Sequence, residues 1–149
     1  MIVKLRSVIQ KDWKFILELR NEKEVRMACY DTSIINYKTH EKYMKKLNNT
    51  SNCYQWIIVC DGEDAGQVKI DDHVFGYMLK ANFRGKGVWS KAYPLVLDNA
   101  KKLNFKKLKG TVKFNEEKLL DIAEKLGFKI IGKVFRDNKE VGYDMEKIL

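Results

Sequence analysis

Residues 75–89 read FGYMLKANFRGKGVW, a strand-like run that passes through a short basic turn into a helical pattern. The turn contains Gly85 and Gly87, whose missing Cβ atoms let an anion approach the main chain closely. Main-chain N–H groups converge on an anion at the start of a helix, and Arg84 and Lys86 add positive charge. The stretch therefore predicts an anion-binding turn between a strand and a helix.

Two common phosphate-binding motifs do not fit this turn. No GK[ST] follows a four-residue spacer, which excludes a P-loop, and the residue three after Gly87 is Ser90, which excludes GxGxxG. Taken alone, the segment is equally compatible with a tight basic turn that binds nothing.

The rest of the chain alternates strand and helix patterns around this turn. Asp12 is placed to cap the first helix and Asn115 the last, and Gly127 is placed to end the last. In the second helix we expect Tyr43, Met44 and Leu47 to face inward. The patterns predict strands over residues 2–7, 54–60, 65–70, 73–79, 108–113, 128–135 and 141–148, and helices over 12–21, 40–47, 89–103 and 115–126.

The composition limits the class of protein. A length of 149 residues suits a single domain, and the net charge of +9 favours anionic partners such as a phosphorylated small molecule or nucleic acid. Three cysteines outside any CxxC spacing and two histidines argue against a zinc site, so we expect no metal. Without a signal-peptide pattern or a long apolar run, we expect a cytoplasmic protein with no membrane partner.

Two segments together resemble the cofactor motifs of the GNAT superfamily of acetyltransferases. The first is Phe75–Gly87, and the second runs from Asn115-Glu116-Glu117 to Glu124–Phe128. The resemblance covers essentially the whole chain. It implies one domain over residues 1–149, of α+β class, with a mixed, mostly antiparallel central sheet and helices on both faces. It also implies acetyl-CoA as co-substrate and direct transfer of an acetyl group to a primary amine.

The resemblance also implies which residues bind acetyl-CoA. The strand before the turn is expected to bulge and splay from its neighbour, so that N–H groups of Tyr77, Met78 and Leu79 bind the pantetheine arm and polarise the thioester carbonyl. Asn115 is expected to touch the cofactor arm, although helix capping explains it equally well. The pyrophosphate is expected to lie on the main-chain amides of Arg84, Gly85, Lys86, Gly87 and Val88, and Trp89 is the next residue expected at the cofactor.

Three positions depart from the family pattern. Trp89 stands where the family has a small residue, and a bulky indole there would narrow the cofactor path or tilt the helix. Pro94 removes a main-chain donor within the helix pattern. The tyrosine that often protonates the departing thiolate aligns with Ala123, so the sequence does not identify the general acid.

The residues that handle the amine are less clearly marked. A carboxylate near the fourth strand often serves as general base in this family, which points to Asp72, with His73 beside it; an ordinary turn explains both residues as well. The N-terminal third resembles acetyltransferases of sugar-nucleotide amino sugars, of the pseudaminic-acid pathway type. The residues that carry this resemblance, and that we expect to contact the acceptor, are Arg20, Asn21, Arg26, Tyr37 and His40.

Other functions stay open at this point. Arg20 also suits the C-terminal end of its helix and His40 the start of one, and a basic enzyme is a poor match for a polycationic polyamine. The lysines also suit a nucleic-acid-binding module, although no RNP, helix-turn-helix or KH-type motif is present, so we do not favour that partner. A catalytically impaired acetyl-CoA binder is a third reading, and the sequence is compatible with a homodimer.

Overall fold

The computed structural model describes residues 1–149, and all seven strands lie in one sheet in the order β1-β2-β3-β4-β5-β7-β6. Only β4 and β5 are parallel, so the predicted mixed, mostly antiparallel sheet is confirmed. The strands are β1 (Val3–Ser7), β2 (Cys53–Cys60), β3 (Glu63–Asp71), β4 (Val74–Leu79), β5 (Lys107–Lys113), β6 (Lys129–Arg136) and β7 (Lys139–Ile148).

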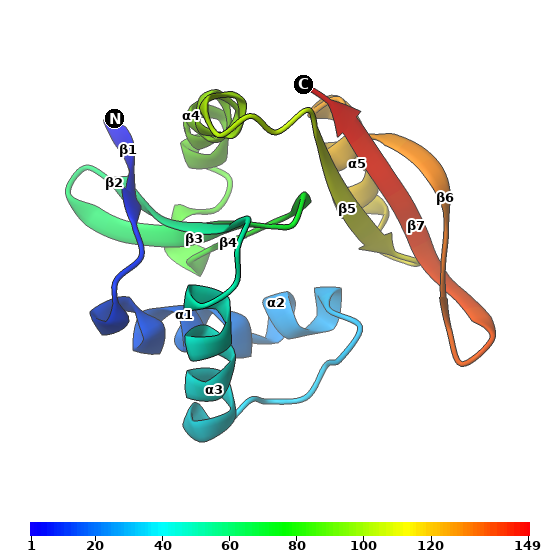
Figure 1. Ribbon diagram of the computed structural model, residues 1–149, viewed down its shortest axis with the longest axis horizontal. Coiled ribbons are helices and arrows are strands. Elements are labelled where there is room, and N and C mark those ends of the chain that lie inside the picture. The colour runs from blue at the N-terminus through cyan, green and yellow to red at the C-terminus, as the bar shows by residue number, and fades with distance from the viewer.

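Helices cover both faces of the sheet, as predicted (Figure 1). In Figure 1 α1, α2 and α3 lie below β1–β4 and α4 lies above, while α5 lies beside β5 and β7. A core of 15 buried residues fills the α4 side, and a smaller core of five lies between the sheet and helices α1 and α3. The helices are α1 (Trp13–Asn21), α2 (Lys23–Ala28), α3 (Tyr37–Asn48), α4 (Val88–Lys102) and α5 (Glu117–Lys125), with single 3-10 turns at Gln10–Asp12 and Ala81–Phe83.

The sheet separates into two halves between β4 and β5. These strands share one pairing, Val74 with Lys109, and the Lys109 N–H donates to the His73 carbonyl at 2.7 Å. Beyond that point the strands diverge, which agrees with the predicted splay. The predicted bulge of β4 is wrong, because β3 and β4 keep a regular register and the shift lies between Ile58 and Val59 of β2.

Two tight hairpins place the starts of β4 and β7 at other residues than the sequence predicts. Asp72 and His73 have φ angles of +45° and +76° and form the two-residue turn between β3 and β4. His73 therefore lies in the turn, and its predicted place in the strand is wrong. Asp137 and Asn138, with φ of +52° and +62°, make the same kind of turn between β6 and β7. Positive φ at both central residues matches the right-handed twist of the strands.

Three details of the helices differ from the predictions. The short helix α2 was not foreseen, and α3 begins at Tyr37, where the Asn36 side chain accepts the Thr39 N–H. Tyr43 lies 43% exposed instead of inward, whereas Met44 and Leu47 are buried. Helix α5 begins at Glu117, because Asn115 has a φ of +71° and cannot act as the predicted cap. Gly127 ends α5 in the left-handed conformation, as predicted.

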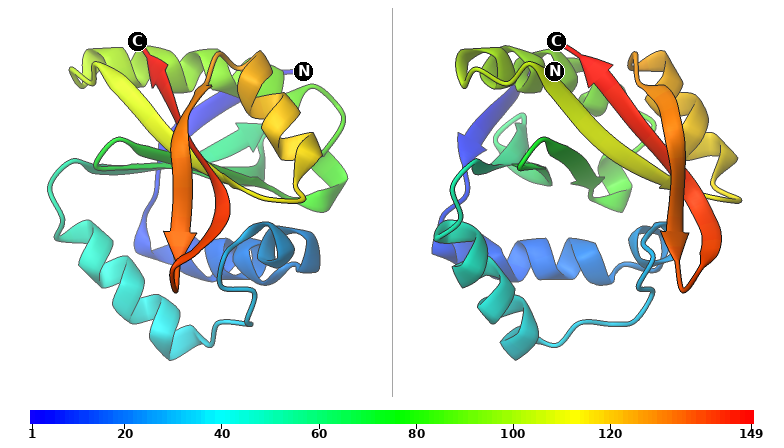
Figure 2. Two further views of the ribbon diagram at one scale, coloured as in Figure 1. Left: turned by 90° about the vertical axis from the view of Figure 1, so that its right-hand side faces the viewer. Right: turned by 45° about the vertical axis from the view of Figure 1, so that its right-hand side comes forward.

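A segment after α1 bridges the two halves of the sheet. In Figures 1 and 2 α1 and α2 run beneath the sheet from the β1–β4 half towards β7. The Lys113 ammonium donates to the carbonyls of Met27 and Cys29 at 3.2 and 3.1 Å, and the Tyr30 ring lies 4.8 Å from the Arg136 guanidinium. We call residues 22–30 the bridging segment.

Gly142 in β7 leaves the space that the Tyr30 side chain of the bridging segment occupies. A Cβ at this position would lie 2.6 Å from the Val112 carbonyl oxygen and would clash with the Tyr30 hydroxyl. We expect Gly142→Ala to lower the free energy of unfolding by about 1–3 kcal/mol, measured by urea denaturation. Gly132→Ala in β6 is the matched control, because its Cβ meets nothing within 4 Å, and its effect should stay within about 0.5 kcal/mol. Equal effects of the two changes would contradict the close contact.

His40 is a buried ring that joins α3 to α1. It is 4% exposed, and its Nε2 lies 2.7 Å from the Trp13 carbonyl oxygen. Burial lowers the pKa of His40 below its usual value, so the folded protein binds a proton less readily than the unfolded chain. The associated stability is present above the ordinary histidine pKa of about 6.5 and is lost as pH falls below it.

We therefore expect the free energy of unfolding to fall between pH 7 and pH 5 in the wild type. His40→Gln should flatten this dependence, while His73→Gln, at the hairpin tip, should keep the wild-type slope. Urea denaturation at several pH values measures the effect. An unchanged slope in His40→Gln would mean that another group causes the loss.

Candidate active site

The gap between β4 and β5 exposes main-chain groups of β4. The Lys80 N–H donates to the Ala65 carbonyl at 2.8 Å, and hydrogen-bonded pairs alternate along an antiparallel ladder. Met78 therefore pairs with Gln67 of β3, while the N–H groups of Tyr77 and Leu79 point towards β5. Of the three residues predicted to bind the pantetheine arm, two direct their N–H groups into the gap and Met78 directs its N–H away from it.

The turn before α4 has the geometry of an anion site. Gly85 and Gly87 have φ angles of +70° and +81°, a left-handed conformation that glycine adopts without steric cost. The N–H groups of the six consecutive residues 85–90 make no hydrogen bond within the chain. The positive end of the 15-residue α4 adds to their pull on an anion. These groups fit the pyrophosphate of acetyl-CoA, and the two exposed strand edges fit the amides of its pantetheine arm.

Arg84 does not leave a free guanidinium for a phosphate. Its Nε donates to the Leu79 carbonyl at 3.0 Å, its Nη1 to Glu24 at 2.7 Å and its Nη2 to Glu22 at 2.5 Å. The positive charge that Arg84 was expected to add at the turn is thus used in two ion pairs to the segment after α1. The sequence contains no local signal for this contact, because 62 residues separate Glu22 from Arg84.

Trp89 packs against β4 from the α4 side and leaves α4 regular. Its indole stacks on the Tyr77 ring with centroids 3.8 Å apart and planes 7° apart, and Phe75 and Tyr93 lie around them. Burial raises the pKa of Tyr77. Helix α4 continues through Pro94 to Lys102. The indole Nε1 is buried without a hydrogen-bond partner, which costs about 1–3 kcal/mol. The Trp89 indole is therefore accommodated among the aromatic side chains between α4 and β4.

The residues predicted to move protons lie away from the gap. Asp72 and His73 occupy the hairpin at the closed end of β4, and Asp72 is about 17 Å along the strand from Tyr77 at 3.4 Å per residue. His73 packs edge-on against Phe105, with centroids 5.1 Å apart. This placement argues against Asp72 and His73 as the base that serves the gap. Ala123 packs against the core from α5 and has no proton to donate.

Most residues predicted to bind the acceptor hold the loop between α2 and α3. Arg20 and Arg26 donate to the carbonyls of Asp31 and Thr32 at 2.8 and 3.0 Å. Both side-chain atoms of Asn21 bond to the main chain of Ile35 at 2.9 Å. The His40 ring is buried, and of the five predicted residues Asn21 and Tyr37 line an open hollow. Carbonyl oxygens therefore engage two nitrogens of Arg26 and the Nη2 of Arg20, whose Nη1 is buried without a partner.

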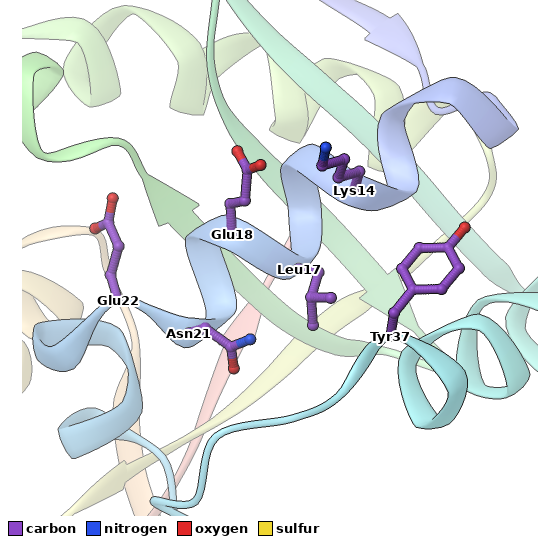
Figure 3. A pocket seen from close by; sticks show the side chains of 6 residues that line it. All are labelled: Lys14, Leu17, Glu18, Asn21, Glu22 and Tyr37. Carbon is purple, nitrogen blue, oxygen red and sulfur yellow. The ribbon is translucent and has the colours of Figure 1, made fainter.

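An open hollow of about 600 Å³ lies along the outer side of α1. Figure 3 shows Lys14, Glu18 and Glu22 projecting from one side of this helix and Leu17 and Asn21 from the other. Glu22 also pairs with Arg84, so one end of the hollow lies next to the anion-binding turn. Glu18 has no ion pair. The sequence signal for these carboxylates is their spacing of four residues, which places them on one side of the helix.

Comparisons with known proteins agree with this architecture. An acetyltransferase (GNAT) domain model matches residues 3–129. The spermidine N(1)-acetyltransferase of Escherichia coli K12 is 28% identical over 144 residues, which cover 91% of this chain and 77% of the relative.

Solved structures share the fold at low sequence identity. The spermidine N-acetyltransferase of Vibrio cholerae, in complex with CoA and spermine, has a TM-score of 0.82 at 19% identity, with 98% of this chain and 95% of that chain covered. The ribosomal-protein-alanine N-acetyltransferase of Brucella melitensis has a TM-score of 0.79 at 13% identity, with 98% and 99% covered.

The chain belongs to the acetyltransferase (GNAT) domain family. It is an N-acetyltransferase that uses acetyl-CoA as co-substrate and acts on an amine. None of its helices has the length and apolar character needed to cross a membrane.

Substitution of Gly87 tests the anion-binding turn. We expect Gly87→Glu to abolish acetyl-CoA binding, because it adds bulk and negative charge beside the unpaired N–H groups. The left-handed backbone also costs a non-glycine residue roughly 1–2 kcal/mol of stability. Gly62→Glu is the matched control. Gly62 lies in the β2–β3 turn with a similar φ of +83°, and its substitution changes the charge by the same amount. Calorimetric titration should show binding by the control only. Unchanged affinity in Gly87→Glu would remove the pyrophosphate from this turn.

Proposed function

We propose that this enzyme transfers the acetyl group of acetyl-CoA to a primary amine of a small polyamine-type cation. The observation that carries the proposal is the charge of the acceptor side. Glu18 and Glu22 line the hollow together with one ammonium, Lys14, and Glu22 and Glu24 share the Arg84 guanidinium, so three carboxylates face two cations. This is a local excess of negative charge on a chain whose net charge is +9.

The donor side and the acceptor side of the site carry groups of opposite charge, which suit two different ligands. The donor side offers the unpaired N–H groups of residues 85–90 and the Lys86 ammonium, which suit the pyrophosphate of acetyl-CoA. The acceptor side offers carboxylates, which suit ammonium groups. The engaged arginines Arg20 and Arg26 favour a cation over a diphosphate as acceptor. The relatives named for spermidine support the same class of amine.

The chain's contribution to the transfer follows from β4. Bound acetyl-CoA supplies the activated acetyl thioester. The N–H groups of Tyr77 and Leu79 point into the gap and would stabilise the negative charge that develops on the carbonyl oxygen during attack by the amine. The stack of Tyr77 on Trp89 closes the α4 side of that region and keeps this part of β4 dry, which strengthens such hydrogen bonds.

The amino sugar of a nucleotide-sugar is a second candidate acceptor. A smaller hollow beside the first is lined by Ile9, Gln10, Lys11, Lys14 and Tyr37. Lys11 and Lys14 would pair with a diphosphate, and the 46% exposed Tyr37 would stack on a sugar or base. Because Lys14 and Tyr37 line both hollows, the two candidates compete for one surface.

Steady-state kinetics with three amines distinguishes the acceptors. The probes are spermidine, UDP-glucosamine and a peptide with an N-terminal alanine, with released CoA thiol and the mass of the product as readouts. We expect spermidine to give the highest kcat/KM. Glu18→Gln should raise KM for spermidine about fivefold with little change in kcat, since one exposed charge contact is worth about 1 kcal/mol.

Glu41→Gln is the matched control, because it removes one exposed carboxylate from α3, in the Lys45 ion pair. It should leave KM unchanged. Preferred turnover of UDP-glucosamine, with loss in Lys14→Met, would instead establish the nucleotide-sugar acceptor. Preferred turnover of the peptide would contradict both candidates.

A further inference from the structure

Arg84 connects the donor turn to the acceptor helices. Its Cα starts the anion-binding turn, and its Nε bond to the Leu79 carbonyl fixes the side chain at the end of β4. The other two guanidinium nitrogens bind one carboxylate each, from Glu22 and Glu24. All three nitrogens of the guanidinium are thus engaged within the chain, and two carboxylates neutralise its charge.

Glu22 lies at the joint between the two helices. It follows the last residue of α1 and precedes the first of α2, with extended φ and ψ of −60° and 139°. The side chains of Arg84 and Glu22 are 29% and 30% exposed, so their ion pair is partly shielded from water, whereas Glu24 is 81% exposed. Partial burial and short geometry make the Glu22 pair the stronger of the two.

We propose that Arg84 is a positioning residue that couples acetyl-CoA binding at the turn to the placement of the bridging segment. An anion on the N–H groups of residues 85–90 fixes the main chain next to Arg84, and the two ion pairs transmit this order to Glu22 and to the hollow on α1. Coupling of this kind is reciprocal, so an occupied hollow in turn favours the turn's binding conformation. The role of the hollow rests on the proposed function; the link from turn to segment does not.

Calorimetric titration with CoA distinguishes this role from that of a phosphate ligand, because the two roles predict opposite signs for one variant. If Arg84 positions the turn, the double variant Glu22→Gln, Glu24→Gln should weaken CoA binding about fivefold. If Arg84 were a phosphate ligand held back by the carboxylates, freeing it should tighten CoA binding. Arg84→Met should weaken binding by a similar factor, and the triple variant should be no weaker than Arg84→Met, since all three remove one interaction.

Glu41→Gln is again the matched control and should bind CoA as the wild type does. Thermal denaturation of each variant shows that it is folded. Tighter binding in the double glutamine variant, or binding equal to that of the control, would overturn the proposal.

Amide hydrogen exchange reports the coupling directly. In the wild type, saturation with CoA should slow exchange in peptides covering residues 22–30. In Arg84→Met at saturating CoA this protection should disappear, while protection of residues 84–90 should remain. A merely structural role for Arg84 would leave the CoA-dependent protection of residues 22–30 unaltered. Neither measurement uses an amine, so failure of the proposed acceptor does not affect the outcome.

Discussion

The single pairing of β4 with β5 is the constraint on which the rest of the structure depends. Strands that paired along their full length would satisfy each other's main-chain groups and leave nothing to bind a substrate. Because β4 and β5 separate after Val74 and Lys109, the N–H groups of Tyr77 and Leu79 face a gap. The same separation removes the hydrogen bonds that would join the halves of the sheet. The bridging segment supplies other contacts, through Arg84 on one side and Lys113 on the other.

Charge is distributed to match two ligands of opposite sign. The donor turn relies on main-chain N–H groups and a helix end, and the Arg84 side chain supports it from behind without contacting the phosphate itself. That arginine instead pairs with carboxylates beside the acceptor hollow. A net charge of +9 therefore describes the surface as a whole and conceals a local excess of carboxylates around Glu18 and Glu22.

Local patterns predicted the fold well, because strands, hairpins and the Gly85–Gly87 turn depend on residues that are close in sequence. They failed where tertiary contacts decide a side chain's role. Arg20 and Arg26 suit a diphosphate by residue type, yet carbonyl oxygens of a nearby loop hold them. Arg84 carries the expected charge, but its partner Glu22 lies 62 residues away. Asp72 satisfies the pattern of a base near the fourth strand. Only the topology shows that it lies at the end of β4 where the gap to β5 is closed.

Side chains join the two halves of the sheet more than main-chain hydrogen bonds do. Strands β5, β6 and β7 pair extensively with one another, and a one-residue contact joins them to β4. The β5–β7 half also shares the 15-residue core with the β1–β4 half through Leu108, Phe128 and Met145, and the Phe128 ring stacks on Phe75 with centroids 5.7 Å apart. Tyr30, Lys113 and the Tyr93 hydroxyl, which donates to the Leu126 carbonyl at 2.9 Å, add further contacts to this part of the chain. A ligand that lies across the gap touches both halves at the place where main-chain pairing is missing, and it therefore adds a link that the sheet itself does not supply.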